Sequence, residues 1–510
     1  MNTKYEKGPI TASFVKLETE KVQDGKKRGK ADKNEATLDL SSSQNTTLTN
    51  ITILVGLLLL QIAISVNPHS GESQPPMFGD YEAQRHWMEI TYNLPIEQWY
   101  VNGTHNDLLY WGLDYPPLTA YHHYALGIIA RKINKSWVEL FDSRGFESVE
   151  HKMFMRISAI LPFFILYLPP LMFHLSRTKK SSAVLKAFAV LYPGLVIIDN
   201  GHFQYNSISL GLFLSCYTFL STGFTLIGSI FFVAALNYKQ MELYHALPVF
   251  IFILSRSFDK SKILESLLKV LKVGAVVIIT FMLIWLPFLL TGTAKDVLIR
   301  VFPFNRGLYE DKVASFWCAF SFILKRLPLE KLQIHMSATL VLLCSFPSLL
   351  SLFLRPTDKN FRLSLLSTSL SFFLFSFHVH EKTILLAAIP ALLLVTEYPD
   401  EVLWLLNITN ISLFSLCVKD NFAFSFFIFF AFFIASVAVS KPTWQHKTTQ
   451  SFCILVGFLI CILELYGPKN QRFPHIYQLA NALFSCVHFL SFLVFFTMQT
   501  FIPIEKSKKE

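Results

Sequence analysis

The sequence predicts an all-α polytopic membrane protein with about 14 transmembrane helices and one large first loop outside the cytosol. Composition supports this fold class, because 52% of the 510 residues are hydrophobic and 16% are charged, whereas soluble domains are about 25% charged. Apolar runs also recur along the chain at lengths that suit membrane spans. Lys and Arg concentrate in short loops and near both ends, as expected of cytosolic segments. The net charge of +10 therefore reflects membrane orientation, and we expect no nucleic-acid partner.

The chain begins with a polar segment and a first span. Residues 1–50 are rich in Lys, Ser, Thr and Asn, and we interpret them as a disordered cytosolic tail. The apolar run at 51–66 follows this tail without a small-residue cleavage site, so it is predicted to be a span and not a signal peptide.

Residues 67–152 form one long hydrophilic loop in this interpretation. The loop contains eleven acidic and six basic residues. Because basic residues favour the cytosolic side, this excess of acid places the loop on the lumenal side.

The other spans are assigned from apolar runs that alternate between basic turns and polar clusters. They are predicted at 153–175, 183–198, 207–221, 223–236, a helix that ends before the basic segment 256–272, then 273–291, 334–354, 363–378, 383–397, 401–417, 421–440, 450–466 and 480–499.

The run at 313–325 is shorter than the roughly 17 residues that a span requires. We expect it to remain lumenal as a re-entrant or interfacial helix, which keeps the basic turn between Arg355 and Arg362 in the cytosol. The even number of spans then places both termini in the cytosol. The last residues, 506–510, match a K-x-K-x-x retrieval pattern, which predicts residence in the endoplasmic reticulum membrane.

Five polar clusters fall on the predicted lumenal face and suggest a single site. They lie in the first loop and at residues 202–206, 239–242, 306–312 and 378–382. No equivalent clustering is expected at the cytosolic ends of the helices.

The residue types in these clusters fit glycosyl transfer from a lipid phosphate. No G-x-G-x-x-G or Walker motif occurs, so a donor carried by lipid is expected in place of a cytosolic nucleotide. Such a reaction needs a carboxylate base, cations for the leaving phosphate and aromatic surfaces for sugars. Asp80 or Glu82 supplies the base. The cations are His380, Lys382 and Arg306, and the aromatic side chains are Trp87, Trp99, Tyr110, Trp111 and Tyr115.

Simpler interpretations of several residues remain open. Asp114 precedes Tyr-Pro-Pro and could serve only to turn the backbone. His202 and Gln204 could satisfy the end of a helix, and Glu381 could form a local ion pair with Lys382.

The motifs resemble the dolichyl-phosphate-glucose-dependent α-1,3-glucosyltransferases of N-glycan assembly. The resemblance covers about residues 51–400 and is closer to the branch that adds the first glucose to Man9GlcNAc2-diphosphodolichol. It rests on Gly79-Asp80-Tyr81-Glu82-Ala83-Gln84-Arg85-His86-Trp87, Tyr110-Trp111-Gly112-Leu113-Asp114-Tyr115-Pro116-Pro117, Gly201-His202-Phe203-Gln204-Tyr205-Asn206, the segment 237–248 and Val379-His380-Glu381-Lys382.

The resemblance implies a GT-C membrane fold, location in the endoplasmic reticulum, a glucosyl-phosphate-dolichol donor, a dolichol-linked oligosaccharide acceptor and inversion to an α-1,3 linkage. It also implies that Asp80 is the catalytic base and that Asp114 lies near the reacting sugars. We assign His380, Lys382 and Arg306 to the donor phosphate. The residues assigned to substrate binding are Glu82, Arg85, His86, Trp87, Trp111, Tyr115, His202, Gln204, Asn206, Lys239 and Glu242.

The expected organisation is a catalytic membrane module at 51–400, including the loop 67–152, then helices at 401–500 and a cytosolic tail at 501–510. No cofactor is expected. An Asp-x-Glu pair can hold Mg²⁺ or Mn²⁺, but we favour no metal, because the basic residues can neutralise a single phosphate.

Three other functions are less well supported by the sequence. The sibling enzyme that adds the second glucose shares Asp80-x-Glu82, residues 202–206 and 379–382, whereas the runs at 83–86, 110–112 and 239–242 favour the first-glucose branch. A transporter or channel would place ionisable residues inside its spans and would have symmetric broken helices. A non-catalytic scaffold would not need clustered acids and cations on one face.

Overall fold

The computed structural model describes residues 47–178, 182–302, 312–324, 332–439, 444–468 and 471–503. The tail before residue 47, Arg306 and the K-x-K-x-x pattern lie outside these ranges. The chain divides into two compact units, Met1–Leu58 and Leu59–Glu510. In the first unit, residues 47–50 are helical, although the sequence predicted disorder up to residue 50.

The regular structure of the described ranges is helical, and the only extended pairing within them is an isolated bridge between Gly103 and Asn106. Eight helices in these ranges are long and apolar enough to span a membrane, which confirms the all-α polytopic class. They are Thr47–Ser65, Val149–Arg177, Ala183–Phe203, Ile263–Leu290, Gln333–Leu354, Pro399–Lys419, Lys447–Tyr466 and Ile476–Gln499. Other predicted spans are shorter or more polar helices, so the count of 14 stays a prediction.

The predicted hydrophilic loop contains two helices that pack against each other. These are α2 (Gly79–Asn93) and α3 (Pro117–Ile133), the latter starting with proline at its first turn. Neither helix was predicted, because the many charged and polar residues of α2 suggested a solvated loop, whereas most of them are buried. Its buried polar residues face other polar groups and therefore do not produce an apolar stripe.

A broken helix carries the next part of the candidate site. Helices α6 (Ala183–Val190) and α7 (Pro193–Val196) are separated at Pro193, and a π-helical segment η4 (Ile197–Phe203) follows. Such π segments often occur at functional sites. Helix α8 (Asn206–Ser221) then packs along α9 (Thr225–Tyr238).

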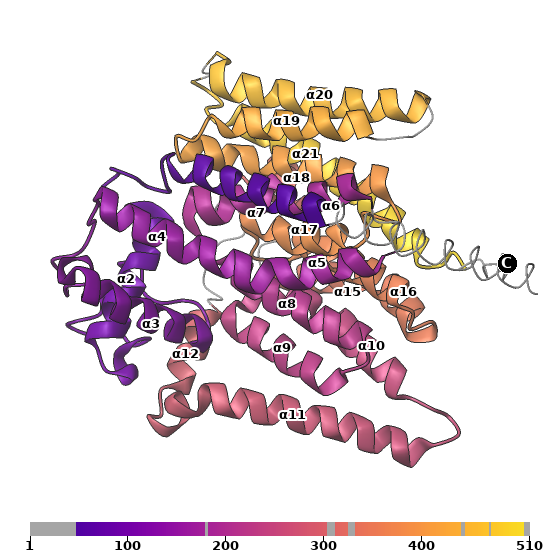
Figure 1. Cartoon of the computed structure of the whole chain (residues 1–510), viewed down its shortest axis with the longest axis horizontal. Helices are drawn as coiled ribbons and strands as arrows, with labels where there is room; N and C mark the ends of the chain where they lie inside the picture. The colour runs from indigo at the N-terminus through magenta and orange to yellow at the C-terminus, as the bar shows by residue number, and fades with distance from the viewer. Residues whose placement is uncertain are drawn as a thin grey trace, which may run out of the picture. The chain divides into compact units, whose positions relative to one another are not determined.

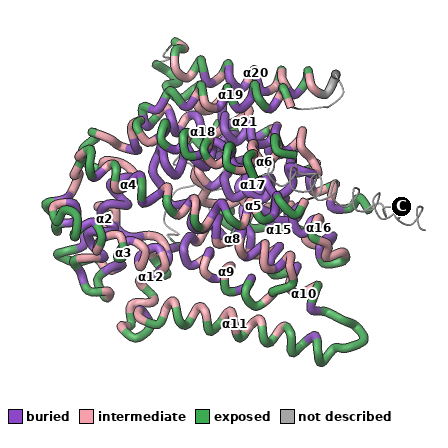
Figure 2. Tube along the Cα trace, in the orientation of Figure 1, coloured by how far each residue is buried: buried purple, intermediate pink, exposed green. Residues whose placement is uncertain are grey.

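Figure 2 distinguishes buried helices from exposed ones in the second unit. Helices α16 (Asp358–Phe375), α17 (Leu385–Leu392) and α18 (Pro399–Lys419) are largely buried. Helix α11 (Ile263–Leu290) runs along one edge of the second unit (Figure 1), and it consists mostly of exposed and half-buried residues (Figure 2). This helix begins at Ile263, ten residues before the span predicted from residue 273, so the predicted span lies within a longer helix.

Further helices complete the structure. They are α4 (Val149–Pro162), η3 (Phe163–Tyr167), α5 (Leu168–Arg177), η5 (Gln240–His245), α10 (Ala246–Ser257), α12 (Ala294–Val301), α15 (Gln333–Leu354), η6 (Glu381–Ile384), α19 (Ser425–Val439), α20 (Trp444–Tyr466) and α21 (Ile476–Gln499). Within the described part of the run at 313–325, residues 313–324, the helical segments are the short α13 (Phe316–Ala319) and α14 (Ser321–Leu324), and the lumenal position of this run stays a prediction. Five of the seven cysteines, Cys216, Cys318, Cys417, Cys461 and Cys486, are buried, and Cys344 and Cys453 are half-buried.

One expectation about the helix ends is wrong. Arg362 forms ion pairs with Asp358 at 3.2 Å and Glu397 at 2.8 Å, and the hydroxyl of Tyr217 donates to Asp358. These residues lie at helix ends predicted to be cytosolic. Charge clustering therefore occurs at both ends of the bundle, and it is not by itself a mark of the active site.

Candidate active site

A cavity of about 730 Å³ brings together segments that are far apart in the sequence. Its wall includes residues from α2, η4, the segment 239–241 that follows α9, the segment 376–386 and the turn after α18. The predicted site residues on this wall are Asp80, Trp87, Trp111, Asp114, Tyr115, His202, Gln204, Asn206, Lys239, His380 and Lys382.

Two glycines hold Asp80 at the start of α2. Gly71 and Gly79 both have positive φ, 70° and 69°. A Cβ on Gly79 would lie 2.7 Å from the backbone nitrogen of Gly71, so the two segments can approach only as glycines. The Asp80 amide donates to the hydroxyl of Ser70 at 3.2 Å, which ties the beginning of α2 to this contact.

The Asp80 carboxylate has an asymmetric environment. Its Oδ2 atom contacts His202 Nε2 at 3.1 Å and accepts hydrogen bonds from Gln204 Nε2 and Lys382 Nζ. No hydrogen bond from the described residues reaches Oδ1. Burial favours the neutral acid, but the charges of Lys382 and His202 outweigh it and hold the pKa of Asp80 well below its usual value. Asp80 is therefore a carboxylate at neutral pH with one oxygen available.

A second layer of polar groups orients Gln204. Lys239 Nζ donates to Gln204 Oε1 at 3.1 Å and to Asn206 Oδ1 at 2.6 Å. Asn206 in turn donates to Asp199 in the π segment at 2.8 Å. With its carbonyl engaged by Lys239, the Gln204 amide directs its nitrogen to Asp80. Burial and the nearby Lys382 lower the pKa of Lys239 to about 8.

Asp420 is a site residue that was not predicted from the sequence. It follows α18, lines the cavity and places Oδ2 at 2.6 Å from His202 Nδ1. The neighbouring Lys419 also lines the cavity. The available signal was a short polar turn, Lys419-Asp420-Asn421, between two apolar runs, but this turn was interpreted only as a connection between spans.

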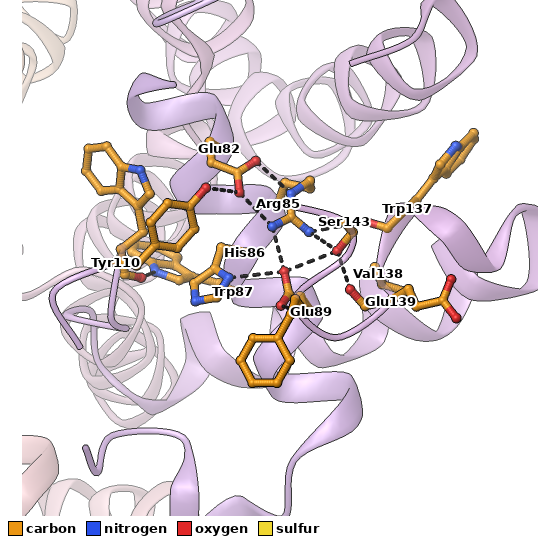
Figure 3. Close-up of polar contacts among 12 residues, drawn as sticks. Glu82, Arg85, His86, Trp87, Glu89, Tyr110, Trp137, Val138, Glu139 and Ser143 are labelled. Carbon is orange, nitrogen blue, oxygen red and sulfur yellow. Dashed lines mark hydrogen bonds and ion pairs between the residues drawn. The ribbon is translucent and has the colours of Figure 1, made fainter. Parts of the chain in front are cut away.

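Three residues predicted to bind substrate form a buried ion network instead (Figure 3). Arg85 Nη2 lies 2.6 Å from both Glu82 Oε1 and Glu89 Oε2, and His86 contacts Glu89 at 3.2 Å. Glu82, Arg85 and His86 are almost completely buried and do not line the cavity. Their spacing of three and four residues places them together on one face of α2.

This network also positions aromatic residues of the cavity wall. The hydroxyl of Tyr110 donates to Glu82 at 2.8 Å (Figure 3). The next residue, Trp111, accepts a hydrogen bond from Trp87 Nε1 at its backbone oxygen, also at 2.8 Å. Glu82 therefore supports the tryptophans at the cavity without lining it.

The other assigned residues have different environments. Glu242 is fully buried, binds His245 at 2.7 Å and does not line the cavity. Asp114 lies in the wall, and its backbone oxygen accepts a hydrogen bond from Gln240 at 3.2 Å. Lys382 makes its ion pair with Asp80, which gives it a role beyond the local pair with Glu381 that the sequence left open.

The two acids of the Asp-x-Glu pair, Asp80 and Glu82, have different partners in the structure. Residues two apart on a helix do not face each other, and both Glu82 oxygens accept from Arg85. Within the described ranges, no group of three or more His, Cys, Asp or Glu residues is arranged to hold a metal ion. Whether the protein uses a metal stays a prediction.

Comparison with known proteins agrees with the resemblance in the motifs. A model of the "ALG6, ALG8 glycosyltransferase family" matches residues 51–495, well beyond the motifs. The chain is 70% identical over 473 residues to a "Probable dolichyl pyrophosphate Man9GlcNAc2 alpha-1,3-glucosyltransferase" of Caenorhabditis elegans, covering 93% of each chain. It is 40% identical to "Dolichyl pyrophosphate Man9GlcNAc2 alpha-1,3-glucosyltransferase" of Gallus gallus, covering 88% of this chain and 96% of that one. The corresponding protein of Mus musculus is also 40% identical, with 88% and 95% covered. The chain therefore belongs to the ALG6, ALG8 glycosyltransferase family.

Proposed function

We propose that this protein transfers glucose from dolichyl phosphate glucose to the terminal mannose of Man9GlcNAc2-diphosphodolichol, forming an α-1,3 linkage with inversion. The observation that carries the proposal is the Asp80 carboxylate, which lies in a cavity beside Lys382 and His202 and has Oδ1 without a partner among the described residues. The names of the relatives support the acceptor and the linkage.

Asp80 acts as the general base in this mechanism. The oxygen of the mannose 3-hydroxyl attacks the anomeric carbon of glucose, and Asp80 Oδ1 takes the proton of that hydroxyl. The bond between this carbon and the phosphate oxygen breaks on the opposite face, which inverts the configuration. Asp80 ends as a neutral acid, and dolichyl phosphate leaves with one additional negative charge.

The leaving phosphate requires positive charge more than a proton. Lys382, His380 and Lys419 line the cavity and supply groups that can carry this charge. Because the phosphate is a stable anion, no second carboxylic acid is needed, in contrast to glycoside hydrolysis.

The remaining cavity wall suits the rest of the two substrates. Trp87, Trp111 and Tyr115 offer aromatic surface to sugar rings. Tyr244, Phe372 and Leu386 form an apolar part of the same wall that fits the beginning of a polyprenyl chain.

The reaction is assigned to the lumenal face of the endoplasmic reticulum membrane, with both termini in the cytosol. This assignment rests on the distribution of basic turns and on the acidic balance of residues 67–152.

Transfer assays with purified protein test the proposal. Dolichyl phosphate glucose is supplied with Man9GlcNAc2 and Glc1Man9GlcNAc2 diphosphodolichol acceptors in parallel, and the linkage of the product is analysed. We expect glucose on the Man9 acceptor only. Transfer to the Glc1Man9 acceptor alone would identify the second-glucose activity, and no transfer to either acceptor would contradict the proposed reaction.

A further inference from the structure

His202 lies between two carboxylates from opposite parts of the chain. Its Nδ1 is 2.6 Å from Asp420 Oδ2, and its Nε2 is 3.1 Å from Asp80 Oδ2. Only 5% of the His202 and of the Asp420 side chain is exposed. Asp420 is therefore connected to the proposed base, Asp80, through one intervening side chain, that of His202, and it is shielded from solvent.

The backbone around Asp420 is shaped for this contact. Asn421 has a φ of 58°, so the chain turns sharply after α18. A Cβ placed on Gly201, the residue before His202, would lie 3.2 Å from the Phe422 ring. The turn after α18 and the end of η4 therefore fit closely together at the histidine.

We propose that Asp420 is a positioning residue for glucosyl transfer, which through His202 keeps Asp80 Oδ2 engaged and leaves Oδ1 to accept the acceptor's proton. The inference rests on the proposed role of Asp80 as base. Asp420 does not touch the reacting atoms. Its effect passes through the imidazole, as in other sites where a carboxylate orients a histidine.

The charges explain why a second carboxylate is needed. Asp80 and Asp420 place two carboxylates against the His202 ring, and Lys382 contributes a positive charge beside Asp80. Lys382 Nζ lies 3.2 Å from His202 Nε2, and the Arg156 guanidinium from α4 interacts electrostatically with Asp420. When Asp80 takes a proton, its charge disappears, but the contact between Asp420 and Nδ1 still holds the imidazole of His202 in place.

Asp420→Asn tests this role because it removes the charge and preserves the shape. We expect kcat to fall about 10-fold to 100-fold, the range known for carboxylates that orient metal-bound histidines, with little change in either KM. The alkaline limb of the kcat–pH profile should move to lower pH, since asparagine does not stabilise an imidazolium. Asp420→Glu, which restores the charge, should recover part of the rate and the original limb.

Glu464→Gln provides a matched control. Glu464 accepts a hydrogen bond from Ser415 of the same α18 helix at 2.9 Å but does not line the cavity. Its neutralisation should leave the rate and the pH profile unchanged. Melting temperatures of all variants establish that they fold.

Two results would overturn the inference: a parental rate and profile in Asp420→Asn, or a loss of rate with an unmoved profile and no recovery in Asp420→Glu. Asp80→Asn is assayed in parallel. If Asp80→Asn retains turnover, the base assignment fails and the inference fails with it. If Asp80→Asn is inactive but Asp420→Asn keeps the parental rate and pH profile, the inference about Asp420 fails and the assignment of Asp80 as base stands.

Discussion

The two oxygens of Asp80 have different environments, and the proposed chemistry depends on this difference. Oδ2 holds the carboxylate in place through His202, Gln204 and Lys382. Asp80→Asn keeps the size of the side chain but removes the proton acceptor, so turnover should fall about 10²–10⁴-fold. Measured beside it, Glu82→Gln should lose less, because Glu82 acts through Tyr110 and Arg85. An inactive Glu82→Gln with an active Asp80→Asn would exchange the two assignments.

In the proposed reaction, Lys382 contacts both the base Asp80 and the donor phosphate. Removing its charge in Lys382→Ala should lower kcat/KM for the donor about 10²-fold and affect the acceptor less. The change should also raise the pKa of Asp80, so activity is lost at a higher pH on the acidic side than in the parent protein. Lys359→Ala is the control, because Lys359 lies over Tyr398 at the other end of the bundle. An unchanged donor dependence would assign Lys382 to structure.

The engagement of Glu82 by Arg85 bears on metal dependence. With both Glu82 oxygens bound to Arg85, we expect transfer to survive excess chelator. Titration of EDTA against activity, with Mg²⁺ and Mn²⁺ added back, measures this. Loss of transfer that either ion restores would show that a metal is required.

At the level of secondary structure, α2 depends on its ion network. Arg85→Ala leaves Glu82 and Glu89 buried without their cation and should lower the free energy of unfolding by about 3–5 kcal/mol. Arg131→Ala should lower the free energy of unfolding far less, because Arg131 is an exposed residue of α3 whose guanidinium lies over the Tyr92 ring. Thermal unfolding in detergent distinguishes them, and equal losses would contradict the importance of the network.

The same network predicts a pH dependence of stability. Burial favours neutral Glu89, but the His86 hydrogen bond and the Arg85 charge outweigh it and lower the pKa of Glu89 to about 2. Its stabilising contribution is therefore complete above the unfolded-state pKa of about 4.3. It is lost as the pH falls from there through 2, which unfolding temperatures of the parent and Glu89→Gln proteins should show. Parallel curves for the two proteins would contradict this.

The helices show which features the sequence could predict. Apolar runs predicted the long helices, and α15 and α18 begin and end within a few residues of the predicted limits. Helix α2 was missed because its buried charges look solvated in the sequence. The partnership of His202 with Asp420 crosses 218 residues. Neither propensity nor local spacing contains information on such a contact, whereas Asp80 and Lys382 were recognisable from their motifs.

At the level of the whole molecule, the membrane orientation can be tested from both sides. In a background without the seven native cysteines, Lys359→Cys should react with an impermeant maleimide in intact microsomes. Lys135→Cys, in the predicted lumenal loop, should react only after the membrane is opened. The opposite labelling pattern would show that the predicted topology is inverted. Reaction of both cysteines in sealed microsomes would refute the predicted topology.

The order in which the ribosome makes the site has a consequence for biogenesis. Asp80 emerges 302 residues before Lys382, and at about 5–20 residues per second this interval lasts roughly 15–60 seconds. The turn that carries Asp420 arrives later still. During this time the nascent chain holds a carboxylate whose cation has not been synthesised. A chain that ends before residue 382 would hold Asp80 without Lys382, and one that ends before residue 420 would hold His202 without Asp420.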